Sequence, residues 1–110
     1  MPVGYDPALA ERIRRALTDR AGVTEKPMFG GLSFLLDGKM FCGIVKDDLM
    51  VRVGPERYEA ALGEAHVRPM DFTGRPMRGF ITIRPDGLKG GRLNRWVQEA
   101  VARAESLPST

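Results

Sequence analysis

Apolar residues recur at helical spacing near the N-terminus. Leu9, Ile13 and Leu17 lie four residues apart, and charged side chains fill most of the positions between them. This spacing is typical of one face of an amphipathic helix. Asp6 precedes the stripe, where its carboxylate can accept hydrogen bonds from the first free N–H groups of a helix. The pattern therefore predicts a helix that begins after Asp6 and ends at Gly22, a residue type favoured at helix ends.

A second helical stripe lies near the C-terminus. Its apolar positions follow three- and four-residue spacing: Leu93, Trp96, Val97, Ala100, Val101 and Ala104. Such a stripe is expected of a helix that packs one face on a hydrophobic core. Between the two ends, residues 56–63 predict a short helix, with Pro55 placed near its start.

The hydrophobic pattern changes to a period of two in the middle of the chain. Alternation predicts strands at residues 32–36, 40–45, 49–53 and 80–84, with further extended pieces at 24–28 and 66–70. Asp37-Gly38 is a strong two-residue hairpin signal. The connections between residues 31 and 53 are too short for parallel crossovers. We therefore predict an α+β fold of two layers, in which an antiparallel sheet of about five strands packs against terminal helices and one short middle helix.

The length of 110 residues fits a single domain, residues 1–110. One cysteine excludes an internal disulfide framework, and one cysteine with one histidine excludes a zinc finger. The N-terminus has no targeting pattern, and no apolar run reaches the roughly 18–20 residues of a membrane span. These features predict a cytoplasmic protein with no membrane partner.

Cys42 and His66 are the first candidates for chemistry. A nucleophilic cysteine needs a partner that stabilises the thiolate, whereas Cys42 lies within a predicted strand and is expected to pack as a small hydrophobic residue. His66 has only Glu64 nearby in sequence, which does not make a catalytic or metal-binding set. We therefore assign no catalytic, cofactor-binding or metal-binding residue and expect a protein that is not an enzyme.

The positive charge is concentrated in one segment. The chain has 17 basic and 14 acidic side chains, a net charge of +3, but residues 68–95 alone carry +5 and the remainder −2. Arginine binds phosphate and carboxylate through paired hydrogen bonds, and glycines before a helix expose backbone N–H groups to an anion. The candidate contacts for an anion or a nucleic acid are Arg75, Arg78, Arg84, Lys89, Gly90, Gly91, Arg92 and Arg95.

A second candidate surface lies on the predicted sheet. Met50 and Arg52, together with Phe80 and Thr82, occupy the alternate positions of their strands, opposite the predicted core. Apolar side chains on such a face suit a protein contact. We therefore expect a protein partner, with a homodimer as the simplest case.

Several motifs occur in a characteristic order along the chain. Met28-Phe29-Gly30-Gly31 precedes the first long strand, where the glycines are expected to permit an unusual backbone turn, and Asp37-Gly38 and Asp47-Asp48-Leu49 follow. Residues 68–77 read R-P-M-D-F-T-G-R-P-M, and Trp96 lies in the last helix. From about Leu9 to Ala104, this order resembles the N-terminal domain of the TfoX/Sxy family.

The resemblance implies an α+β fold with an antiparallel sheet and flanking helices. It also implies a regulatory role, since full-length family members regulate natural competence and act with the transcription machinery. Because the sequence ends at Thr110, the family's second, helical domain is not expected, and the chain is interpreted as a stand-alone member. Two alternatives stay open: a nucleic-acid-associated regulator that uses the basic segment, and a small-anion site formed by Arg78 with Gly90, Gly91 and Arg92.

Overall fold

The computed structural model describes residues 5–28, 31–71 and 76–106 of the 110-residue chain. Its elements, in chain order, are α1 (Pro7–Ala16), β1 (Val23–Met28), β2 (Gly31–Leu36), β3 (Lys39–Val45), β4 (Asp48–Arg52), α2 (Pro55–Leu62), β5 (Val67–Asp71), β6 (Pro76–Ile83), the 3₁₀ turn η1 (Pro85–Leu88) and α3 (Arg92–Ser106). The α+β prediction is confirmed. The sheet has six strands rather than about five, because both short extended pieces join it as edge strands.

Every pair of neighbouring strands is antiparallel, and the strand order is β1-β2-β3-β4-β6-β5. Four consecutive strands form a meander, and the final hairpin then inserts β6 between β4 and β5. The two edge strands each contain a proline, Pro27 in β1 and Pro69 in β5. Since proline has no N–H to donate, each edge is a poor template for a further strand.

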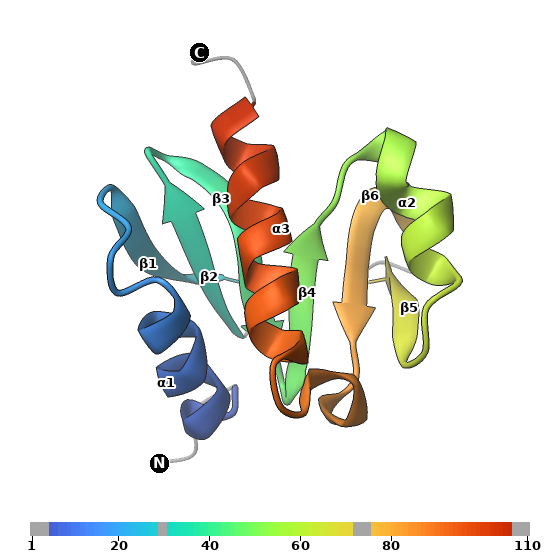
Figure 1. The fold of residues 1–110 in the computed structure, drawn as a ribbon, viewed down its shortest axis with the longest axis horizontal. Coiled ribbons are helices and arrows are strands. Elements are labelled where there is room, and N and C mark those ends of the chain that lie inside the picture. Colours follow the sequence, from blue (N-terminus) through green and yellow to red (C-terminus); the bar gives the residue numbers. More distant parts are fainter. Residues whose placement is uncertain (1–4, 29–30, 72–75, 107–110) are drawn as a thin grey trace.

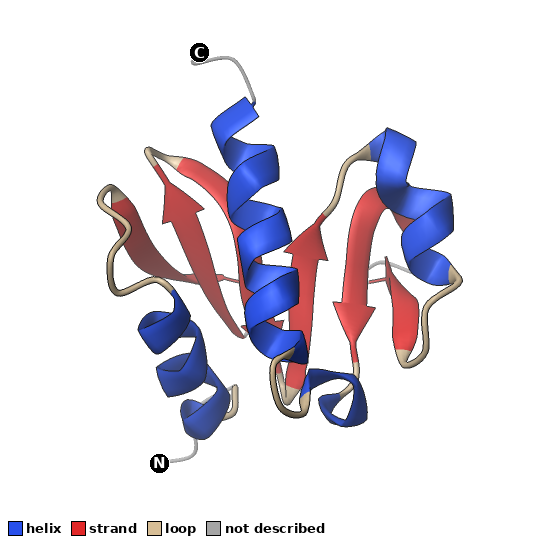
Figure 2. Cartoon of the chain, viewed as in Figure 1, coloured by secondary structure: helices blue, strands red, loops and turns tan. Residues whose placement is uncertain are grey.

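All three α-helices lie on the same face of the sheet (Figure 1, Figure 2). The long helix α3 crosses β3 and β4, α1 packs beside α3, and α2 covers β6. Asp6 caps α1 as predicted, accepting a hydrogen bond from the Ala8 N–H at 2.9 Å. The predicted end of this helix was wrong: α1 stops at Ala16, and Gly22 lies instead at φ +85° just before β1.

The hydrophobic core lies between the sheet and this layer of helices. One row of side chains crosses four strands in register, from Phe34 through Cys42 and Val51 to Ile81, and all four are fully buried. Trp96 closes the core from the middle of α3 at 2% exposure. Strand alternation therefore divides each strand between this core and the opposite face, which carries no helix among the described residues and is called the helix-free face below.

Gly31 begins β2 and does not form the unusual turn expected of it. Its φ is not positive, so the reason for glycine is space. A Cβ at this position would lie 1.9 Å from the carbonyl oxygen of Ile44, across the ladder in β3. The Asp37-Gly38 turn is present, with φ of +50° and +84° between β2 and β3. Phe29 and Gly30, the other candidates in this motif, lie outside the described residues.

Candidate functional site

The basic segment of residues 68–95 does not form one surface. Arg68 is paired in register with Thr82, and both alternate with core residues, so they lie on the helix-free face. The side chain of Arg84 reaches the same side, where it meets the start of β4. Arg92 and Arg95 belong instead to the N-terminal end of α3 in the helix layer, and Lys89 lies in the turn between η1 and α3. The chain reversal at η1 therefore separates residues that are close in sequence.

Carboxylates within the chain neutralise much of this segment. Arg84 donates to Asp48 at 2.7 Å, between Nη1 and Oδ1, and Lys89 lies 3.5 Å from Asp86. Burial raises the pKa of Asp48, an effect that the Arg84 guanidinium opposes. These pairings reduce the charge available for a polyanion.

Two further basic candidates are exposed. Arg78 in β6 and Arg92 at the start of α3 have no ion-pair partner among the residues that the structure describes. Gly90 and Gly91 are also exposed and precede α3. Arg75 lies outside the described residues.

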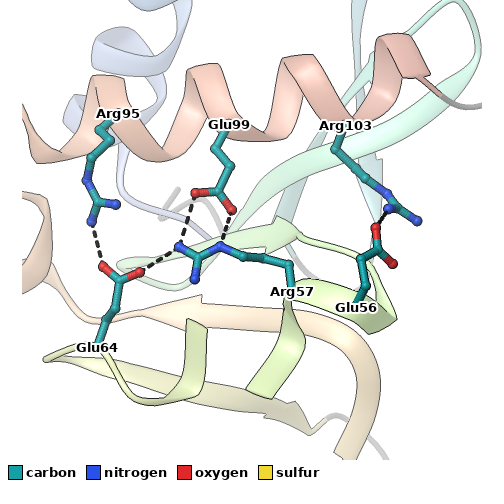
Figure 3. A network of polar contacts seen from close by, with 6 residues as sticks. All are labelled: Glu56, Arg57, Glu64, Arg95, Glu99 and Arg103. Atoms are coloured by element: carbon teal, nitrogen blue, oxygen red, sulfur yellow. Dashed lines mark hydrogen bonds and ion pairs between the residues drawn. The ribbon is translucent and has the colours of Figure 1, made fainter. Parts of the chain in front are cut away.

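Ion pairs join α2 to α3 along the outer side of the helix layer (Figure 3). Arg57 of α2 donates to Glu99 of α3 through Nε at 2.9 Å and to Glu64 through Nη2 at 2.6 Å. Arg95 donates to the other oxygen of Glu64 at 2.8 Å. The Arg57 and Arg95 guanidinium groups lie 5.7 and 4.6 Å from the ring centre of Trp96. The network therefore fixes α2 and the turn after it against the core tryptophan.

A further ion pair, between Glu56 of α2 and Arg103, extends this network along α3 (Figure 3). The groove beside the network has a volume of about 270 Å³. Its charged lining includes Glu64 and Arg95, which already bind each other. The arrangement suits a structural clamp, because these charges are satisfied within the chain.

The pH dependence of stability tests this clamp. Burial alone would raise the pKa of Glu64, but the hydrogen bonds from Arg57 and Arg95 outweigh it and hold the pKa below its usual value. Ionised Glu64 therefore stabilises the fold at neutral pH, and this contribution is lost as the pH falls through the folded-state pKa. We expect Glu64→Gln to lower the free energy of unfolding by about 1 kcal/mol near neutral pH and by much less near pH ~3.

Urea unfolding at the two pH values measures this difference. Glu59→Gln is the matched control, because Glu59 lies on α2, just before Glu64 in the chain, and is exposed. An equal loss at both pH values for Glu64→Gln would contradict the assignment of the stabilisation to the ionised carboxylate.

The helix-free face carries the four residues considered for a protein contact. The β4–β6 register pairs Met50 with Thr82 and Arg52 with Phe80, on the side away from the core. The guanidinium of Arg52 lies 5.8 Å from the ring centre of Phe80. Met50 is only 2% exposed, and the end of its side chain lies next to Gly43. It therefore contributes little accessible surface to this face. Arg52, Phe80 and Thr82 are half-buried and accessible.

Cys42 is buried in the core, whereas His66 is exposed in the turn before β5. Complete burial raises the pKa of Cys42, which keeps the thiol protonated and away from any substrate. His66 is exposed at φ +69°, and its backbone carbonyl accepts a hydrogen bond from the Arg84 N–H at 2.9 Å.

Within the described ranges no group of three or more His, Cys, Asp or Glu side chains is placed to hold a metal ion. In the same ranges, no helix has the length and apolar character needed to cross a membrane.

Comparison with protein families gives one match. The model of the TfoX N-terminal domain matches residues 15–104, which include the whole sheet and most of α3. No curated protein matches the chain, and no solved structure matches it.

Proposed function

Because this chain belongs to the TfoX N-terminal domain family, we propose that it is a non-enzymatic regulatory module that acts through protein contacts. The observation that carries this proposal is the helix-free face of the sheet (Figure 2), on which the Arg52 guanidinium of β4 lies 5.8 Å from the ring centre of Phe80 in β6. Arginine and aromatic side chains are enriched at the centres of protein interfaces. A role in competence or transcription is part of the same proposal and rests on the family resemblance, and a cytoplasmic location is proposed from the sequence pattern.

The proposed contact is made through the face of the sheet and not through its edges. Pro27 and Pro69 interrupt the hydrogen-bonding capacity of the two edge strands. The side chains that the face offers to a partner are Arg52, Phe80 and Thr82, since Met50 is only 2% exposed. A second copy of the chain is the proposed partner, giving a homodimer in which the two sheets pack face to face.

Light scattering at micromolar concentration tests the homodimer. We expect the mass of two chains for the unmodified protein and the mass of one chain for the double variant Arg52→Glu, Phe80→Glu, since four like charges would then face each other. Arg15→Glu is the control, because Arg15 is 78% exposed on α1 and lies in the helix layer. A single-chain mass for the unmodified protein at every concentration would exclude the homodimer and leave a different protein as the partner.

The alternative of a nucleic-acid-associated regulator has weaker support. Its proposed contacts are divided between the helix-free face and α3, and Arg84, Lys89 and Arg95 have carboxylate partners. The small-anion alternative retains exposed Arg92 and the two glycines before α3, but Arg78 belongs to β6. The contact between Arg52 and Phe80 on one sheet face therefore favours a protein contact over both.

A further inference from the structure

A hollow of about 340 Å³ lies on the helix-free face, where the start of β4 approaches β5 and β6. Its apolar lining is Val45, Pro69 and Met70. Met70 is 2% exposed although it lies outside the main core cluster, so it forms the bottom of the hollow. This volume falls in the range of small-molecule sites, roughly 300–1,000 Å³. An aliphatic group placed here would leave water on contact with Met70.

Three charged side chains, Lys46, Asp48 and Arg68, also line the hollow. The Asp48 carboxylate is offset by Arg84 at 2.7 Å. Neither Lys46 nor Arg68 has a carboxylate within ion-pairing distance in the described part of the chain. The hollow therefore combines an apolar base with two cations that form no ion pair with a described residue, although the Arg68 charge also helps to hold down the pKa of Asp48.

We propose that this hollow binds a small aliphatic carboxylate. The carboxylate is held by Arg68, whose planar guanidinium matches its two oxygens, and the hydrocarbon body rests on Met70. Lys46 adds a second positive charge, and the Thr82 hydroxyl is a further donor in the lining. The hollow lies on the same sheet face as the proposed dimer contact and shares Thr82 with it, but its charged groups, Lys46 and Arg68, are distinct from Arg52 and Phe80.

The charge balance favours a monoanion over phosphate. Asp48 also lines the hollow, and burial of this carboxylate already raises its pKa. A dianion would place two negative charges against it, whereas a carboxylate places one. The apolar base adds selectivity by chain length, because each buried CH₂ strengthens binding by about fourfold.

Calorimetric titration of the full chain with the sodium salts of acetate, butyrate and hexanoate tests the proposal at constant ionic strength. We expect the dissociation constant to fall about fourfold for each added CH₂ that is buried, reaching the millimolar range or tighter with hexanoate. Hexanol and inorganic phosphate are the control ligands, and both should bind at least tenfold more weakly than hexanoate. Equal affinity for the three carboxylates, or tighter binding of phosphate, would overturn the proposal.

Two variants locate the site. Arg68→Glu should weaken hexanoate binding at least tenfold, and Val45→Trp, which fills the hollow, should weaken it similarly with an unchanged circular dichroism spectrum. Arg92→Glu makes the same charge change at exposed α3 and should stay within twofold of the unmodified protein. An equal loss with Arg92→Glu would place binding at α3 and refute the hollow.

The Arg52→Glu, Phe80→Glu variant separates this result from the proposed function. Because Arg52 and Phe80 do not line the hollow, the variant should bind hexanoate at least as tightly as the unmodified protein, to within threefold. Loss of hexanoate binding in this variant with Arg68 intact would place the ligand at Arg52 and Phe80 and refute the hollow.

Discussion

Replacement of Trp96 by alanine is expected to lower the free energy of unfolding by about 3–5 kcal/mol, the cost of deleting a large buried aromatic side chain. Trp96 is 2% exposed and is the largest of the fully buried side chains. The change also removes the ring on which Arg57 and Arg95 rest. Since domains of this size are stable by roughly 5–15 kcal/mol, the variant is expected to lose a large share of its stability.

Urea unfolding followed by far-ultraviolet circular dichroism measures this loss. Fluorescence is unsuitable, because Trp96 is the only tryptophan in the chain. Trp96→Phe retains an aromatic ring and should recover most of the stability. Arg95→Ala removes one stacked guanidinium, whose side chain is 51% exposed, and should cost less than about 1 kcal/mol. Equal losses for Trp96→Phe and Trp96→Ala would show that core volume is not what the tryptophan supplies.

The local elements of the fold are predictable from the sequence because their signals are local. Alternating apolar positions identify β2 to β4, and the Asp37-Gly38 pair, whose residues both take positive φ, identifies the hairpin between β2 and β3. The insertion of β6 between β4 and β5 has no such signal. It depends on pairings such as Met50 with Thr82, which join residues far apart in the chain.

The α2–α3 clamp illustrates the same limit for side chains. In the sequence, Arg57, Glu64 and Glu99 cannot be told apart from the charged residues of any exposed helix face. Glu64 lies in the turn after α2. The three residues meet only because α2 and α3 lie on the same face of the sheet, where these long side chains reach across the space between the helices (Figure 3). The distribution of charged residues in the sequence predicts the basic segment. Ion pairs with carboxylates and the chain reversal at η1 then decide which of its positive charges remain exposed. The hollow beside Arg68 likewise depends on the register of β5 with β6.

Replacement of Gly31 by alanine is expected to lower the free energy of unfolding by about 2–3 kcal/mol, at the upper end of the cost of overpacking. The added Cβ would lie 1.9 Å from the carbonyl oxygen of Ile44. That atom belongs to the backbone of a central strand, so a side-chain rotation does not relieve the clash. The β2–β3 ladder must separate locally, which weakens the register that pairs Leu32 with Ile44.

Gly63→Ala provides a control for the added methyl group. Gly63 has φ −78°, and its Cβ would meet only the Ala60 carbonyl at an ordinary 3.4 Å. This variant should be neutral or slightly stabilising, because alanine restricts the unfolded chain. Thermal unfolding of both variants shows why position 31 is a glycine. It separates the close approach of the Ile44 carbonyl from the greater conformational freedom of a glycine backbone. If Gly31→Ala were as stable as Gly63→Ala, the contact with β3 would not be what requires glycine at the start of β2.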